Sequence, residues 1–114
     1  VLEFTKGHSD KFALETDPFL AASGADILIT DTWTSMGEEA EKEERKKIFK
    51  DYQINRQLLV AANAGAMVQH CLPAYRGQEI TEEVFEEHAD EIFNEAENRL
   101  HVQKAVMVKL MKKD

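Results

Sequence analysis

The sequence predicts an α/β protein built around an open, doubly wound parallel sheet. Two short apolar runs, at residues 25–30 and 66–70, have the length and composition of strands buried in such a sheet. Helical patterns lie before, between and after these runs, and strands that alternate with helices form parallel sheets with right-handed crossovers. The 114 residues suit one domain but are few for an enzyme with two substrates.

Local signals place the first elements of the chain. Residues 12–15 are expected to form a short strand, because apolar side chains alternate there with smaller or polar ones. A helix is predicted to begin after Asp17, which suits the N-cap, with Pro18 at the first helical position. Gly24 is a natural stop for this helix, and the strand at 25–30 follows.

The middle of the chain predicts two helices before the second strand. Residues 38–49 form a charged helix, and a charge run of this kind is usually a solvated face. Its oppositely charged residues four positions apart are Glu38/Lys42, Glu41/Arg45 and Glu43/Lys47. Residues 55–62 predict a second, short helix, and residues 66–70 are the next strand.

The C-terminal part predicts a helix at residues 81–88, a short strand at 91–93 and a final helix at 99–112. The final helix has a wide apolar arc, which favours contact with more than one surface. The residues of this arc are Val102, Ala105, Val106, Met107, Val108, Leu110 and Met111.

The charge balance and the single cysteine restrict the class of protein. With 22 acidic and 14 basic residues the net charge is −8, which disfavours a broad surface for nucleic acid or an anionic membrane. No apolar run approaches the roughly 20 residues that cross a bilayer. Cys71 cannot form an intramolecular disulfide, so a reducing compartment is expected. The first residue is Val1 and no signal-peptide pattern follows, so the chain is interpreted as part of a longer protein.

Two motifs of unusual polar residues follow the two predicted strands. Residues 31–37 read Asp-Thr-Trp-Thr-Ser-Met-Gly, and residues 69–74 read Gln-His-Cys-Leu-Pro-Ala. Ligands of open α/β sheets bind beyond the carboxyl ends of the strands. If the two strands are neighbours, Asp31 and Cys71 share one cleft.

The residue types of these motifs suit a zwitterionic amino acid. The Asp31 carboxylate complements an amine, while Ser35 and the backbone at Met36, at a predicted helix start, complement a carboxylate. Cys71 adds a thiol whose reactivity depends on its pKa. Structural explanations remain open: Ser35 with Glu38 is a capping box, and a lone intracellular cysteine is often a small buried apolar residue.

Neighbouring residues have structural explanations as well. His70 and Cys71 are adjacent, so on a strand they would point to opposite faces, which weakens a zinc-binding pair. Trp33 is expected to pack rather than to stack on a ligand. Pro73 shapes a turn, and a cis bond before it is compatible with that role.

Together with Glu95-Ala-Glu-Asn-Arg99, the segments Asp31-Thr-Trp-Thr-Ser-Met-Gly37 and His70-Cys-Leu-Pro73 closely resemble the ornithine carbamoyltransferases. The order and spacing fit across essentially the whole chain. The resemblance implies a Rossmann-like three-layer αβα fold and the incomplete second domain of a two-domain carbamoyltransferase. Residues 1–98 would belong to the ornithine-binding domain, and residues 99–114 would be a helix that packs back on the carbamoyl-phosphate domain.

The resemblance also implies roles for individual residues. The implied contacts are Asp31, Ser35 and Met36 to L-ornithine, and Cys71, Leu72 and Arg99 to carbamoyl phosphate. Asp31, Cys71 and Arg99 would be catalytic, with Arg99 stabilising charge on the carbonyl oxygen. The reaction would be attack of the neutral δ-amine on carbamoyl phosphate, giving L-citrulline and phosphate, with no organic cofactor and no metal. Glu95, Glu97 and Asn98 would position Arg99, and His70 would be structural.

The chain departs from the family pattern in two respects. Tyr75 occupies a position where many bacterial members have His. The Ser-x-Arg-Thr phosphate loop and the His-Pro-x-Gln motif of the family are absent from this sequence. In the family the active site is completed by an N-terminal domain and by a neighbouring subunit of a homotrimer, so the chain alone is expected to lack turnover.

The sequence is also compatible with two other functions, and it favours one cellular location. The protein would otherwise be a carbamoyltransferase for another amine such as putrescine, although a diamine has no carboxylate for the loop at Ser35 to hold. Alternatively, it would be a non-catalytic amino-acid-binding or oligomerisation module. The expected location is the cytoplasm, or the mitochondrial matrix in a eukaryote.

Overall fold

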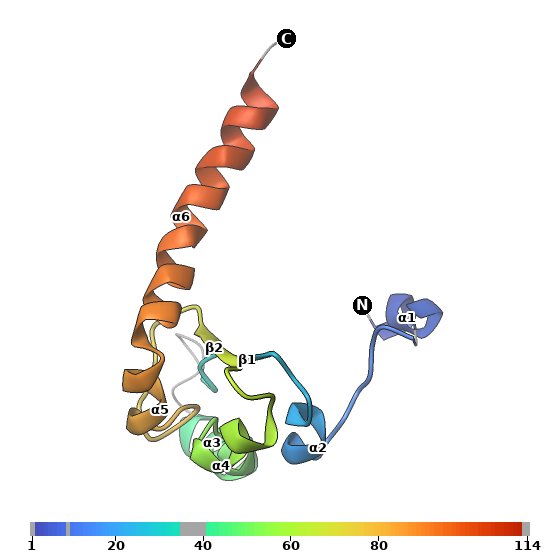
Figure 1. Ribbon diagram of the computed structural model, residues 1–114, viewed down its shortest axis with the longest axis vertical. Coiled ribbons are helices and arrows are strands. Elements are labelled where there is room, and N and C mark those ends of the chain that lie inside the picture. The colour runs from blue at the N-terminus through green and yellow to red at the C-terminus, as the bar shows by residue number, and fades with distance from the viewer. Residues whose placement is uncertain (1, 9, 35–40, 113–114) are drawn as a thin grey trace.

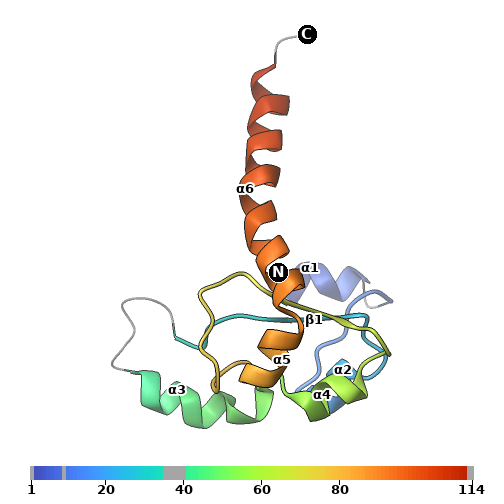
Figure 2. The ribbon, with the colours of Figure 1, turned by 60° about the vertical axis from the view of Figure 1, so that its left-hand side comes forward.

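The computed structural model describes residues 2–8, 10–34 and 41–112. Its elements, in chain order, are α1 (Leu2–Thr5), η1 (Lys6–His8), α2 (Pro18–Ala22), β1 (Ile27–Thr30), α3 (Lys42–Phe49), η3 (Lys50–Tyr52), α4 (Arg56–Ala61), β2 (Met67–His70), α5 (Glu82–Glu87) and α6 (Ala89–Met111). Helices α2, α3, α4 and α5 lie below the strands, and α6 rises from the body on the other side (Figures 1 and 2).

The two strands are parallel neighbours, as predicted. Ile27 pairs with Met67 and Thr30 pairs with His70, so both strands end at the same edge of the sheet. The crossover between them contains α3 and α4. The expected fold class is confirmed, and the pairing brings the residues that follow each strand to one place.

The core lies against one face of this sheet. Leu28 and Val68 are buried on that face, at 9% and 0% exposure. The core is completed by residues from α2, α4, α5, α6 and the segments before α4 and α5, namely Ala22, Ile54, Leu58, Ile80, Val84, Phe85 and Ile92. Because these residues come from six separate segments of the chain, the core depends on the tertiary fold rather than on any single element.

The opposite face of the sheet is not buried by the described residues, although the sequence predicted buried parallel strands. Ile27, Ile29 and Met67 are 46%, 69% and 39% exposed on it. Parallel sheets normally have both faces covered. The described residues therefore supply the covering layer for one face of the sheet.

The predicted helix starts and stops are confirmed where capping residues are present. Asp17 Oδ1 accepts hydrogen bonds from the backbone N–H groups of Phe19 and Leu20, at 2.8 and 3.3 Å. Gly24 has φ +74°, a left-handed conformation that residues with a Cβ rarely adopt. Asn55 caps α4 by accepting from the N–H of Leu58 at 2.9 Å.

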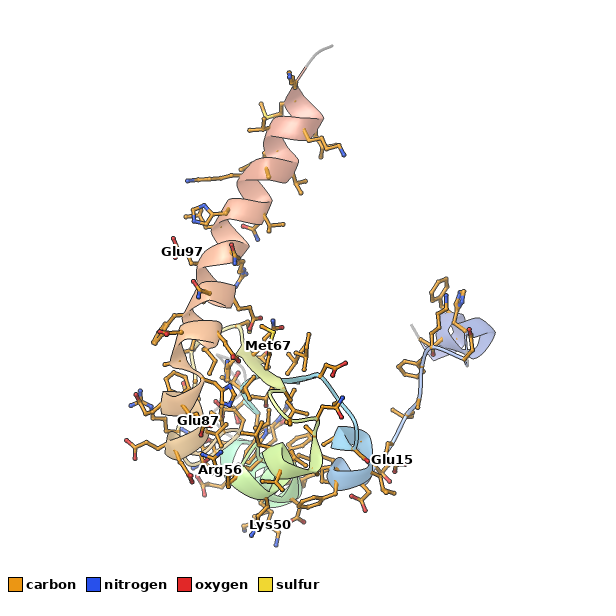
Figure 3. All side chains as sticks on the ribbon, in the orientation of Figure 1. Glu15, Lys50, Arg56, Met67, Glu87 and Glu97 are labelled. Carbon is orange, nitrogen blue, oxygen red and sulfur yellow. The ribbon has the colours of Figure 1, made fainter. Side chains whose placement is uncertain are left out.

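Arg56 joins α4 to α5 across the surface of the body. Its guanidinium pairs with Glu83 at 3.0 Å and also with Glu87 (Figure 3). These side chains are solvent-exposed, so salt screens the attraction, and the buried core contributes more to the association of the two helices.

Two predicted strands are wrong. Residues 12–15 have no regular structure and Leu14 is 75% exposed, because no described segment lies alongside to pair with them. Residues 91–93 belong to α6, which begins at Ala89 rather than at Arg99. Within the helix Ile92 is fully buried, and Glu91 accepts a hydrogen bond from the N–H of Val68 at 2.9 Å. Packing on β2 therefore favours a helix over three isolated strand residues.

The charged helix at 38–49 is described from Glu41 onward. Its N-terminal pair Glu38/Lys42 lies partly outside the described residues. The predicted pair of Glu41 with Arg45 forms at 3.0 Å. Glu43 pairs with Lys46 at 3.0 Å instead of with Lys47.

The outer part of α6 stands clear of the body (Figure 1). Residues 97–112 are exposed, including Leu110 at 80% and Met111 at 79%. Helix α6 runs unbroken through residues 98 and 99, and the division of the chain there remains a prediction. Among the described residues, no helix combines the length and apolarity needed to cross a membrane.

Candidate active site

The first residue after each strand contributes to one polar contact. Cys71 Sγ donates a hydrogen bond to Asp31 Oδ1 over 3.4 Å. The contact exists because β1 and β2 are in register at their ends, where Thr30 pairs with His70. The structure thus brings together the two residues that the sequence placed in one cleft, while their catalytic roles remain predictions.

The environment of Cys71 keeps its thiol protonated. Partial burial raises the pKa of the thiol, and the hydrogen bond to the Asp31 carboxylate and the negative charges of Asp31 and Glu95 raise it further. A thiol with a raised pKa is a poor nucleophile at neutral pH. Cys71 is therefore suited to donating a hydrogen bond and to positioning a ligand, rather than to forming a covalent intermediate.

A cavity joins Cys71 to helix α6. It has a volume of about 320 Å³ and is lined by Cys71, Glu95, Ala96, Asn98, Arg99 and Val102. Arg99 forms no ion pair with any described residue, so its guanidinium is available to an anion beside the Cys71 thiol. Two of the predicted site residues thus share one cavity, and Asp31 is linked to it by its contact with Cys71.

The acidic residues around Arg99 have other partners than expected. Glu97 Oε1 accepts a hydrogen bond from His101 Nε2 over 3.1 Å, so Glu97 pairs with His101, and its predicted role in positioning Arg99 stays a prediction. Glu95 Oε2 is buried without a hydrogen-bond partner in the described structure. Glu95 therefore belongs to the electrostatic surroundings of Cys71, a placement that the sequence did not indicate.

The backbone after Cys71 turns sharply. Leu72 has φ +57°, which is uncommon for a residue with a branched side chain, and the Leu72–Pro73 bond is cis, in line with the possibility noted from the sequence. The N–H of Leu72 donates to His70 Nδ1 at 3.0 Å. The N–H of Leu72 is therefore already occupied by His70.

Asp31, His70 and Cys71 form a group whose potential ligand atoms all lie within 4.8 Å of one another. The expectation that strand alternation separates His70 from Cys71 was wrong, because β2 ends at His70 and the chain turns after it. Both ring nitrogens of His70 are already hydrogen-bonded, to the Leu72 N–H and to Glu79. Metal binding by His70 would require one of these bonds to break.

Other predictions for the first motif have mixed outcomes. Trp33 packs on Phe49 with ring centroids 6.3 Å apart, and its carbonyl accepts from Arg45 at 3.4 Å, which confirms a packing role. Ser35 and Met36, predicted to contact ornithine, lie outside the described residues.

Glu79 is the residue near the site that the sequence did not single out. It is fully buried, and its carboxylate oxygen Oε1 lies 3.0 Å from His70 Nε2 and 2.5 Å from the backbone nitrogen of Tyr75. Residues 76–82 contain one basic side chain and, besides Glu79, two other acidic or amide side chains, Gln78 and Glu82, so composition gave no reason to single out Glu79.

We expect Asp31→Asn to lower the pKa of the Cys71 thiol. The substitution removes a carboxylate that both accepts from the thiol and repels the thiolate, so the deprotonated form becomes more favourable. The rate of alkylation by iodoacetamide, followed from pH 6 to 10, reports this pKa directly because Cys71 is the only cysteine. The control is Asp90→Asn, on an exposed residue of α6. An unchanged profile in Asp31→Asn would contradict the contact.

Comparison with known proteins places the chain in a family. Residues 2–110 match the family described as aspartate/ornithine carbamoyltransferase, Asp/Orn binding domain. An ornithine carbamoyltransferase of Nitratiruptor sp. is 53% identical over 112 residues, which are 98% of this chain and 36% of that protein. One from Gloeobacter violaceus is 61% identical over 95 residues, covering 83% and 30%.

Solved structures agree with this match. The anabolic ornithine carbamoyltransferase of Campylobacter jejuni superposes with a TM-score of 0.81 at 52% identity, covering 85% of this chain and 32% of that one. An N-acetyl-L-ornithine transcarbamylase superposes with a TM-score of 0.64 at 31% identity, covering 84% and 30%. The chain thus spans about a third of the length of these relatives. With its parallel strands, its Asp31–Cys71 contact and this match over nearly its whole length, the chain belongs to the aspartate/ornithine carbamoyltransferase family and corresponds to the Asp/Orn-binding domain.

Proposed function

We propose that the protein containing this chain is an ornithine carbamoyltransferase. It transfers the carbamoyl group of carbamoyl phosphate to the δ-amine of L-ornithine and releases L-citrulline and phosphate. The observation that carries the proposal is the Asp31–Cys71 contact, because Cys71 also lines a cavity together with Arg99. The names of relatives that are 50% or more identical support ornithine as the amine.

Asp31 and Cys71 are the residues that we expect to contact the amine substrate. An amine with a lysine-like pKa of about 10.4 is mostly protonated at neutral pH, and only its neutral form attacks a carbonyl carbon. The Asp31 carboxylate attracts the cationic substrate into the site. The protonated Cys71 thiol then lies beside the reacting amine as a neutral neighbour, so, unlike a thiolate, it does not stabilise the cationic form of the amine, which has no lone pair for the attack.

Arg99 and the turn at Leu72 are expected to contact carbamoyl phosphate, which is the electrophile of the reaction. Negative charge develops on the carbonyl oxygen as the amine attacks, and we assign its stabilisation to the guanidinium of Arg99, which lines the cavity beside Cys71. Because the Leu72 N–H is bonded to His70, the carbonyl of Leu72 is left to accept from the carbamoyl NH₂ group. Donor and acceptor contacts of this kind align the carbamoyl carbon with the amine.

Several finer features form part of the same proposal. We assign the protein to arginine biosynthesis, which the 52% identity to an anabolic relative supports. The proposal includes a homotrimer located in the cytoplasm, or in the mitochondrial matrix of a eukaryote, as expected for the family that the motifs resemble. The transfer chemistry needs neither a metal nor an organic cofactor.

A second amine substrate is a specific alternative. The fold also matches N-acetyl-L-ornithine transcarbamylase at 31% identity, so the architecture is compatible with more than one amine. Putrescine is a further rival, although it has no carboxylate for Ser35 and Met36 to bind.

The test is citrulline formation by the full-length protein that contains this chain, with ornithine, N-acetylornithine and putrescine as competing amines. We expect carbamoyl phosphate to be consumed with ornithine and the chain alone to be inactive. Turnover of another amine in place of ornithine would correct the substrate. A folded full-length protein with no turnover of any of the three would favour the non-catalytic binding or oligomerisation module.

A further inference from the structure

The turn that carries Cys71 and Leu72 is attached to a buried pair of titratable side chains. His70 and Glu79 are both fully buried, and His70 Nε2 lies 3.0 Å from Glu79 Oε1. Neither side chain reaches the cavity that contains Arg99. The chemistry proposed above uses neither of them directly, so their position needs a separate explanation.

The hydrogen bonds define which ring nitrogen of His70 has the proton. The Leu72 N–H donates to Nδ1 at 3.0 Å, so Nδ1 must present a lone pair. The proton is then on Nε2, and Nε2–H donates to the Glu79 carboxylate. Glu79 thus selects the tautomer that can hold Leu72, in the way that a carboxylate beside a ligating histidine orients its ring.

Glu79 also holds the other end of the turn. The N–H of Tyr75 donates to the same oxygen, Oε1, over 2.5 Å. The backbone of Glu79 is itself fixed, because its carbonyl accepts from the N–H of Ile54 at 2.8 Å. One buried carboxylate therefore restrains residues 72 and 75, on both sides of Pro73.

The burial of Glu79 carries a cost in free energy. Burying a carboxylate carries a desolvation penalty, and Glu79 Oε2 has no hydrogen-bond partner among the described residues to offset it. An apolar side chain of similar volume often stabilises such a position as well or better. A buried carboxylate at position 79 is explained if its hydrogen bonds hold the turn after Cys71 in place, even though they do not add to the stability of the fold.

We propose that Glu79 is a positioning residue, which acts through the His70 tautomer and the Tyr75 N–H to hold Cys71 beside Asp31 and to keep the Leu72 carbonyl facing the substrate. The second part of this role rests on the proposed function. The first part, the placement of Cys71, does not depend on it.

The test compares Glu79→Leu with Glu79→Gln. Leucine removes both acceptors but fills the space, whereas the glutamine carbonyl oxygen can still accept from His70 Nε2–H and from Tyr75 N–H. Glu82→Leu is the matched control, since Glu82 is an exposed residue of α5. Three readouts are used: imidazole ¹⁵N shifts for the His70 tautomer, the pH profile of Cys71 alkylation, and kcat and KM of the full-length protein.

We expect Glu79→Gln and Glu82→Leu to keep the Nε2–H tautomer and the alkylation profile of the unmodified chain. Glu79→Leu should lose the single tautomer and alkylate several times faster at pH 8, because Cys71 moves away from Asp31. In the full-length protein its kcat should fall at least 10-fold. A folded Glu79→Leu protein with an unchanged tautomer and unchanged alkylation would overturn the proposal.

If Glu79→Leu does not fold, two substitutions of His70 test whether the acceptor at the Nδ1 position holds the turn at Leu72. Asparagine at position 70 places its Oδ1 where Nδ1 lies and keeps the acceptor for Leu72, whereas glutamine reaches the Nε2 position and loses that acceptor. The proposal requires His70→Asn to keep the slow Cys71 alkylation and His70→Gln to lose it, and the reverse order contradicts it. If the full-length protein has no activity, the proposed function fails, and the tautomer and alkylation readouts still decide the role of Glu79.

Discussion

Asp31→Asn in the full-length protein is expected to lower kcat/KM for ornithine by about 10- to 100-fold. A hydrogen bond to a charged group contributes about 1.5–3 kcal/mol, and each 1.4 kcal/mol corresponds to a factor of about 10 in rate. The substitution removes the charge that attracts the amine and the acceptor that holds the Cys71 thiol. Because both effects act on the amine side, KM for carbamoyl phosphate should change little.

Steady-state rates of citrulline formation, with each substrate varied in turn, measure this effect. Asp90→Asn is again the control, because it makes the same chemical change on an exposed part of α6. Equal losses in both variants, or a loss confined to carbamoyl phosphate, would contradict the role of Asp31.

Ile92→Ala is expected to cost about 2–5 kcal/mol of unfolding free energy, the range for large-to-small substitutions in a core. Ile92 has 0% exposure and lies in the first turns of α6, where the helix packs against β2. A typical domain has about 5–15 kcal/mol of total stability, so this loss is a large fraction of what the chain has. The urea midpoint followed by circular dichroism at 222 nm should fall sharply.

Ile29→Ala provides a control with the same change in side chain. Ile29 is 69% exposed on β1, so its substitution should shift the unfolding free energy by no more than about 0.5 kcal/mol. Equal effects at the two positions would show that the start of α6 does not contribute to the core.

The first prediction depends on residues that the sequence pointed to, whereas the second depends on a burial that the sequence did not predict. Asp31 and Cys71 could be identified from the sequence, because unusual polar residues follow apolar runs and strand ends in parallel sheets face ligands. The burial of Ile92 could not. A three-residue segment around it is compatible with strand or helix, and only its packing on β2 decides in favour of the helix.

The sequence was sufficient to predict the ends of a helix where a single residue has one strong conformational preference. Asp17, Pro18 and Gly24 define the ends of α2, since a short acceptor side chain, a fixed φ and access to positive φ act within one turn. The order and spacing of the three motifs were enough to indicate the family. Residues 12–15 show the limit, because alternation describes a strand only when another strand lies alongside.

The sequence by itself determined the parallel strand–helix order, the ends of α2 and the family, and it predicted that Asp31 and Cys71 lie together, because these depend on short-range chemistry or on motif spacing. Only the tertiary structure decided that Cys71 donates to Asp31 and that Glu79 holds His70. The physical reason is that these contacts depend on strand register, helix phase and burial. These properties are set when the whole core packs, and they are not encoded in any one segment.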